Sequence, residues 1–212
     1  MSQIYQQYVA DLKQSLDRLP WQTVAAIADV LERARLEQRQ IFILGNGGSA
    51  ATASHMACDW AKNTALPGRA RLRVMALTDN AALLSALAND LGYEGVFAEQ
   101  LINLVRPGDV VIAISTSGNS PNVLKAIQVA RASGAFTIGW TGGHGGQMAG
   151  MVDIALVVDS HCVEQIEDIH LIVEHMLTNA LRQAIAEELA PQADALRQAV
   201  AEESSNHARG VP

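Results

Sequence analysis

Hydrophobic positions follow two kinds of pattern along this chain. Two stretches before residue 39 carry apolar residues at helical spacing, and Pro20 separates them. Five short apolar runs typical of buried strands come next, at residues 40–44, 72–77, 109–114, 136–140 and 153–158. Helical patterns lie between the runs, and a long one follows at about 163–188. This alternation of strands with helices predicts a doubly wound parallel sheet of the α/β class.

The pattern contains no linker that would separate two large domains. We expect an N-terminal helical segment at residues 1–38 that packs on a central domain at 39–190, followed by a helical extension and tail at 191–212. Only 17% of the 212 residues are charged, whereas typical soluble domains carry about 25%. Because interface cores are depleted of charge, this shortage suggests faces that are buried between subunits.

Charge and termini exclude several classes of protein. The net charge of −7 argues against nonspecific binding to nucleic acid. The sequence has no uncharged apolar run of about 20 residues, so we expect no membrane span. Its first residues are polar where a signal peptide would be apolar, which favours a cytoplasmic protein. Cys58 and Cys162 lie far apart without CxxC spacing, so neither a disulfide framework nor a zinc knuckle is expected.

Two loops at strand ends combine glycine with hydroxyl side chains. Gly45-Asn46-Gly47-Gly48-Ser49 follows the first apolar run, and Ser115-Thr116-Ser117-Gly118-Asn119-Ser120 follows the third. Strand ends and helix N-termini favour anion binding in such sheets, and the hydroxyls would complete a cradle without lysine. No lysine follows either loop, and the last glycine of GxGxxG is missing, which disfavours the known nucleotide motifs. The alternative is a pair of ordinary turns with Ser/Asn caps.

Titratable residues gather on two of the predicted helices. His55 and Asp59 share one helix face among mostly apolar neighbours, which fits an acid/base pair or half of a metal site. The alternative is an exposed ion pair of little energetic value. On the late helix Glu167, Glu174 and His175 share one broad face. Because charged helix faces are usually solvated, local spacing leaves both interpretations of this face open.

The segments 45–49 with His55, 115–120 and 165–170 together resemble sugar isomerase (SIS) domains, most closely the phosphoheptose isomerases. The resemblance implies a flavodoxin-like, five-stranded parallel sheet in a homotetramer with active sites between subunits. It also implies conversion of sedoheptulose 7-phosphate to D-glycero-D-manno-heptose 7-phosphate through an enediol.

The same resemblance implies roles for particular residues. Asp59 and His175 would transfer protons. Zinc would be coordinated by His55, Asp59, Glu167 and His175. Substrate contacts fall to Asn46, Gly47, Gly48, Ser49, Asp90, Ser115, Thr116, Ser117, Ser120, Glu164 and Glu167, with the hydroxyls holding the phosphate. Asp59 stands where the family has glutamate, Glu167 where glutamine is usual, and Asn63 where arginine is expected. Two carboxylates and two imidazoles form a suitable zinc set.

Two other functions are compatible with the resemblance. One is a non-catalytic SIS protein that senses phosphosugars or acts as an adaptor for the replication initiator. Such relatives lose acid/base residues from these helices, so the presence of His55, Asp59, Glu167 and His175 counts against it. The other is an isomerase of a different ketose phosphate, and the departures at Asp59 and Asn63 motivate it.

Overall fold

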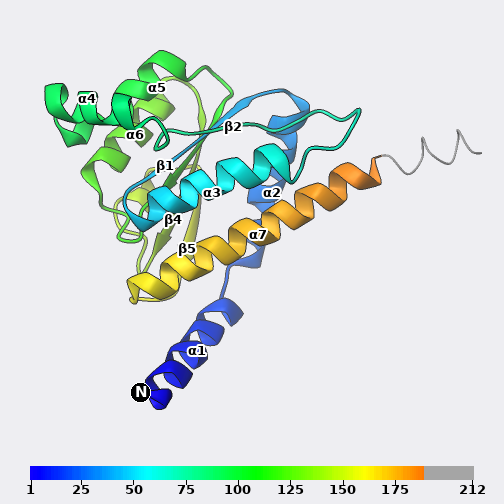
Figure 1. The fold of residues 1–212 in the computed structure, drawn as a ribbon, viewed down its shortest axis with the longest axis vertical. Coiled ribbons are helices and arrows are strands. Elements are labelled where there is room, and N and C mark those ends of the chain that lie inside the picture. Colours follow the sequence, from blue (N-terminus) through cyan, green and yellow to red (C-terminus); the bar gives the residue numbers. More distant parts are fainter. Residues whose placement is uncertain (189–212) are drawn as a thin grey trace, which may run out of the picture.

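A single parallel sheet organises the chain. The computed structural model describes residues 1–188 and is shown in Figure 1. Its strands are β1 (Gln40–Gly45), β2 (Arg73–Ala76), β3 (Val110–Ile114), β4 (Phe136–Gly142) and β5 (Ile154–Val158). They pair in the order β2-β1-β3-β4-β5, and every neighbouring pair is parallel. This is the flavodoxin-like strand order, so the fold class predicted from the sequence is confirmed.

Helices cover both faces of the sheet. They are α1 (Ser2–Asp17), α2 (Trp21–Leu36), α3 (Gly48–Lys62), α4 (Ala81–Leu91), α5 (Ala98–Leu104), α6 (Pro121–Ala132) and α7 (Val163–Glu187). Two 3-10 turns, η1 (Tyr93–Gly95) and η2 (Met148–Gly150), complete the connections. Each helix lies in a part of the chain where the sequence shows a helical pattern, and α7 agrees closely with the range of about 163–188 that was expected. The helical extension expected at 191–212 lies outside the described residues.

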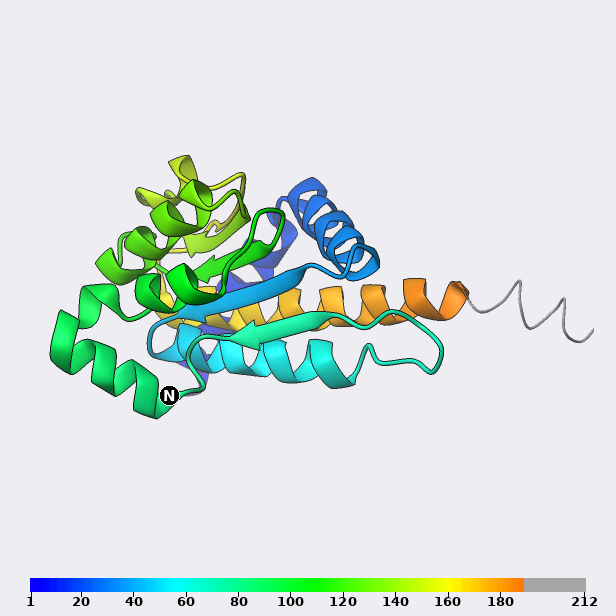
Figure 2. The same ribbon diagram turned by 90° about the horizontal axis from the view of Figure 1, so that it is seen from above.

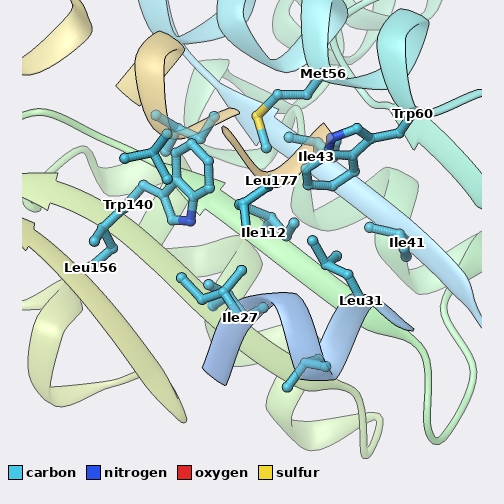
Figure 3. Close-up of a cluster of buried hydrophobic side chains, with 14 of the residues drawn as sticks. Ile27, Leu31, Ile41, Ile43, Met56, Trp60, Ile112, Trp140, Leu156 and Leu177 are labelled. Carbon is cyan, nitrogen blue, oxygen red and sulfur yellow. The ribbon is translucent and has the colours of Figure 1, made fainter. Parts of the chain in front are cut away.

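The core has two halves because successive strand residues point to opposite faces. Ile41 and Ile43 of β1 join a cluster formed with α2, α3 and α7, which includes Met56 and Trp60 (Figure 3). Phe42, between those two isoleucines, joins a second cluster under α5 and α6. A strand that is buried on both faces needs a continuous apolar run, as the sequence of β1 has.

The long helix α7 is held near both of its ends. At its start, the Tyr8 hydroxyl of α1 donates to Asp168 Oδ2 at 2.5 Å. Just past its end, the buried Arg35 of α2 donates to the carboxylates of Glu32 and Glu188. Between these anchors α7 lies alongside α3 in both views (Figures 1 and 2). The anchors therefore fix which part of α7 faces α3.

Helix α1 extends away from the rest of the molecule (Figure 1). It leaves large apolar side chains exposed, among them Ile4, Tyr5 and Val9. Over residues 1–188, none of the helices has the combination of length and apolar character required to cross a bilayer. The exposed apolar side chains of α1 are compatible with the buried faces that the shortage of charge suggested.

Candidate active site

The two glycine- and serine-containing loops meet at the centre of the sheet. β1 and β3 are neighbours, with Gly45 paired to Ile114 at their carboxyl ends. The chain then leaves β1 for α3, whose apolar face packs in one core cluster, and leaves β3 for α6, which packs in the other. The connections after β1 and β3 therefore run to opposite faces of the sheet. Open α/β sheets bind ligands in the crevice between two such connections.

Hydroxyl groups converge in the second loop. Ser115 Oγ lies 3.1 Å from Ser120 Oγ and 3.4 Å from Ser117 Oγ. Ser117 Oγ also accepts a hydrogen bond from the backbone N–H of Asn119 at 3.2 Å. Ser120 is the N-cap of α6, yet its side chain makes no capping hydrogen bond in the described chain. These hydroxyls lie beside a helix N-terminus, where an anion is favoured by free N–H groups.

The first loop turns sharply into α3 and is held by amide side chains. Its N-cap Gly47 has φ of 55°, a left-handed conformation that favours glycine. Asn46 and Asn122 exchange side-chain hydrogen bonds at 2.9 and 2.8 Å, and the Tyr93 hydroxyl donates to Asn46 Oδ1 at 3.0 Å. This network fixes the Asn46 side chain at the strand ends. Tyr93 and Asn122 carried no signal in the sequence, because both are distant from Asn46 along the chain.

A glycine-rich turn after β4 packs directly on the second loop. Gly118 has φ of +64°, and a Cβ there would lie 2.1 Å from the carbonyl oxygen of Gly145. A cavity of about 380 Å³ opens between this turn and the second loop, and His144 and His161 line it with Thr116 and Ser117. The glycines at 142–146 therefore shape the second loop as well as the connection that follows β4.

Four titratable side chains meet where α3 packs on α7; we call them the α3–α7 cluster: His55, Asp59, Glu174 and His175. One ligand atom from each lies within 4.8 Å of all the others. His55 Nε2 is 3.1 Å from His175 Nε2 and 3.6 Å from Asp59 Oδ2. The two imidazoles are 44% and 49% exposed, so the cluster is open to solvent on one side. His55 is thus more exposed than its apolar neighbours suggested, because the buried ones among them, such as Met56 and Trp60, lie on the other side of α3.

Glu174 is the buried member of the cluster, with 0% of its side chain exposed. Thr178 donates to Glu174 Oε1 at 2.7 Å, but Oε2 has no hydrogen-bond partner among residues 1–188. Oε2 lies 3.4 Å from His175 Nε2 and 3.8 Å from His55 Nε2. Burial raises the pKa of Glu174 above its usual range.

The α3–α7 cluster has the composition and spacing of a divalent metal site. Tetrahedral zinc with bonds of about 2.0–2.2 Å separates neighbouring ligand atoms by about 3.3–3.6 Å. In the structure, His55 Nε2 lies 3.1 Å from His175 Nε2, 3.6 Å from Asp59 Oδ2 and 3.8 Å from Glu174 Oε2. Imidazole nitrogens and carboxylate oxygens are both common zinc ligands. A metal ion would also give the unpartnered Glu174 oxygen a partner, so these residues fit such an ion.

Comparison with known proteins identifies the family. The family model described as SIS domain matches residues 4–142. A phosphoheptose isomerase of Rhodospirillum rubrum is 42% identical over 162 residues, which are 76% of this chain and 86% of the relative. The chain belongs to the phosphoheptose isomerase family of SIS-domain proteins.

Further family members agree in sequence and in structure. A phosphoheptose isomerase of Roseiflexus is 39% identical over 78% of this chain and 83% of its own. A solved phosphoheptose isomerase from Neisseria gonorrhoeae superposes with a TM-score of 0.78 at 29% identity. That superposition covers 86% of this chain and 96% of the other. The resemblance seen in the sequence is therefore confirmed at the level of family and fold.

The structure of this phosphoheptose isomerase family member separates two carboxylates that the sequence placed on one helix face. Glu174 joins His55, Asp59 and His175, whereas Glu167 does not belong to that group of mutually close ligand atoms. The Glu167 carboxylate instead lies against Gly48, where an added Cβ would come within 2.3 Å of its Oε1. Glu167 therefore lies at the first loop and Glu174 at the α3–α7 cluster.

The other predicted polar residues lie apart from the cluster. Asp90 is exposed on α4 and accepts a hydrogen bond from Asn89 at 2.8 Å. Glu164 is exposed at the start of α7, where a backbone hydrogen bond and the Cys162 thiol lower its pKa. Both residues stay candidate substrate contacts. His170 points toward the sheet and packs on Trp140, away from the cluster, as its place on the helix face predicted.

Proposed function

We propose that this protein converts sedoheptulose 7-phosphate to D-glycero-D-manno-heptose 7-phosphate by proton transfer through an enediol. The observation that carries the proposal is that Asp59 of α3 and His175 of α7 lie in one cluster. The two helices are far apart in sequence, since His55 and His175, which are in contact, are separated by 120 residues. Family membership supports the same activity. We also propose that the protein works in the cytoplasm.

The strand-end loops supply the phosphate site of this proposal. Their hydroxyls are those of Ser49, Ser115, Thr116, Ser117 and Ser120, and the start of α3 adds free backbone N–H groups. Hydroxyls and amides hold a phosphate through hydrogen bonds and the helix dipole, so no lysine is needed. Asn46, held by Asn122 and Tyr93, is placed at the same strand ends and is suited to a sugar hydroxyl.

The α3–α7 cluster supplies the acid and the base. One group removes the proton from the carbon beside the ketose carbonyl and returns it to the former carbonyl carbon, which leaves an aldose. The other carries a proton between the two oxygens, so no proton is gained or lost overall. Asp59 and His175 are suited to these tasks, and each positioned proton transfer typically contributes about 10²- to 10⁴-fold to the rate.

A divalent ion fits beside the same groups. His55, Asp59 and His175 would hold zinc as the family resemblance implies, and Glu167 was the fourth ligand expected from the sequence. Bound zinc would supply polarisation of the carbonyl and enediolate oxygens. A residue that coordinates metal is a weaker free base, so the metal-loaded and metal-free proteins should differ in how Asp59 and His175 act.

We further propose a homotetramer with active sites between subunits. The half-exposed imidazoles of His55 and His175 leave one side of the cluster open, where a neighbouring subunit could close it. The exposed apolar side chains of α1 also support assembly. Light scattering coupled to size exclusion should give four times the 22.6 kDa of one chain. A monomer at micromolar concentration would contradict this part of the proposal.

The activity is tested by incubating the protein with sedoheptulose 7-phosphate in deuterium oxide and following both sugars by NMR. We expect aldose to form and deuterium to appear at the carbon that receives the proton. A tetramer that binds the sugar phosphate without exchange would contradict the proposal and favour the adaptor function. Asp59 is one methylene shorter than the family glutamate, about 1.5 Å less reach. A panel of hexulose and pentulose phosphates therefore completes the test, and faster turnover of one of these would assign the protein to that substrate.

A further inference from the structure

We propose that Glu174 is the fourth protein ligand of the metal ion at the α3–α7 cluster, in place of Glu167. This inference rests on the proposed function only for the idea that a divalent cation belongs at this site. It assigns a role to a carboxylate that the SIS resemblance leaves without one.

The first support is the burial of a carboxylate oxygen, Glu174 Oε2, that has no hydrogen-bond partner among residues 1–188. Buried polar atoms are nearly always paired, because an unpaired one costs the whole of its desolvation energy. Glu174 Oε1 is satisfied by Thr178, whereas no hydrogen bond in the described part of the chain reaches Oε2. Oε2 faces the Nε2 atoms of His55 and His175, at 3.8 and 3.4 Å. A cation shared with these nitrogens would satisfy it.

The second support is the position of the alternative ligand. Glu167 precedes Glu174 by seven residues, which is roughly 10 Å along a helix. Its carboxylate lies against Gly48 at the start of α3, whereas His55 lies about two turns further along that helix. Glu167 would have to leave Gly48 and move along the groove between the helices to reach the cluster. Glu174 is already there.

The third support is the charge and number of the donors. Two carboxylates balance the charge of one divalent ion, and two neutral imidazoles complete a tetrahedral set that suits zinc better than calcium or magnesium. Catalytic zinc sites usually have three protein ligands and keep one position for water or substrate. Coordination by Glu174 would fill that position, so this residue determines whether a bound ion presents an open site.

The experiment compares two carboxylates of the same helix. The full-length protein is stripped with a chelator and titrated with Zn²⁺ against a chromophoric competitor. Partners that only orient a ligand already change affinity by about 10- to 100-fold, so Glu174→Gln should raise the zinc Kd at least that much. Glu167→Gln removes the same charge from α7 and should leave the zinc Kd unchanged. The reverse result, with affinity lost in Glu167→Gln and kept in Glu174→Gln, would overturn the proposal.

A second readout separates direct coordination from an indirect effect. Co²⁺ in the wild type should give the intense visible absorption of a tetrahedral site, and Glu174→Gln should weaken and shift it. Glu174→Asp keeps the charge but draws the carboxylate back by about 1.5 Å, so it should change the spectrum even if the glutamine variant folds poorly. An unaltered cobalt spectrum in folded Glu174→Asp and Glu174→Gln would refute the assignment.

The metal measurements are independent of turnover. Zinc affinity that depends on Glu174 in a protein without isomerase activity would support this inference and contradict the proposed function. Isomerase activity together with zinc affinity that is insensitive to Glu174 would do the opposite.

Discussion

The two halves of the candidate active site are assembled in different ways. The loops at 45–49 and 115–120 are short continuous segments, and hydrogen bonds such as that between Ser115 and Ser120 span only a few residues. In the α3–α7 cluster, His55 and His175 meet across 120 residues. The first half is a local structure positioned by the sheet, whereas the second exists only when α7 has packed on α3 at one register.

The difference explains why the sequence identified the helix face but not the carboxylate. Residues seven positions apart on a helix differ by only about 20° in direction. Glu167 and Glu174 therefore point to the same side of α7, and spacing cannot distinguish them. They differ by translation along the axis, and the register of α7 depends on anchors such as Arg35 with Glu188. That information is absent from the local pattern.

The largest expected effect separates the chemistry of the cluster from the binding by the loops. Asp59→Asn and His175→Gln should each lower kcat by about 10²- to 10⁴-fold, because a positioned acid or base is lost. The KM for the sugar phosphate should change little, since the loops are intact. Steady-state kinetics with zinc content measured on the same samples checks this, and Asp29→Asn on α2 is the control. If Asp59→Asn or His175→Gln raised KM and left kcat unchanged, the cluster would act in binding rather than in chemistry, and the distinction between cluster and loops would be wrong.

The next effect tests how tightly the second loop is packed. Gly118→Ala combines a positive φ with an added Cβ only 2.1 Å from a backbone oxygen, whereas Gly47→Ala has a positive φ and nothing within 4 Å. The positive φ alone should cost about 1–3 kcal/mol at either position. Overpacking should add about 1–3 kcal/mol for Gly118→Ala only. Denaturant unfolding measures the loss of unfolding free energy in both variants. Equal losses would show that the turn at 142–146 moves aside for the added Cβ at little energetic cost.

A pH experiment tests the burial of His170, the histidine of α7 that lies away from the α3–α7 cluster. Burial against Trp140 lowers the pKa of His170 to about 4, although the backbone oxygen of Thr141 lies 3.4 Å from its Nε2. Because the folded pKa is below the unfolded value of about 6.5, only the unfolded chain takes up this proton as the pH falls from 6.5 toward 4. The folded state loses about 2 kcal/mol from this group between pH 7 and pH 5.

The variant His170→Asn should lack this loss. The comparison is the change in unfolding free energy between pH 7 and pH 5, which is insensitive to any constant cost of the substitution. The same change in wild type and variant would show that His170 accepts a proton without unfolding.

The smallest effect concerns single hydroxyls of the loops. Ser117→Ala and Ser120→Ala should each raise KM by about tenfold, because a hydrogen bond to a charged group contributes about 1.5 kcal/mol or more. The kcat should stay close to that of the wild type. Ser54→Ala is a suitable control, since the partners of that hydroxyl, Ala50 O, Thr78 Oγ1 and Asp79 Oδ1, all lie outside the two loops. If kcat falls as KM stays constant, the loops take part in chemistry as well as binding.

Much of the architecture was readable from apolar runs and turn residues. The order of strands and helices along the chain follows from apolar runs such as those of β1 and β3, which are buried on both faces. The two loops stood out because each follows such a run, whereas the pairing of β1 with β3 is a finding of the structure. Partners that come together through packing were not readable. Asn122 and Tyr93 hold Asn46, and the turn at 142–146 shapes the second loop. The exposure of His55 also depends on which side of α3 the sheet covers.

The contact between Glu167 and Gly48 has a consequence for any ligand that enters the first loop. The carboxylate lies against the first residue of α3, where the positive end of the helix dipole attracts negative charge. An incoming phosphate would therefore meet an anion that belongs to the protein itself. Binding of a phosphate there would be an ion exchange, in which the Glu167 carboxylate leaves the helix terminus as the phosphate arrives. The binding free energy would then be the difference between the interactions of these two anions with the helix terminus.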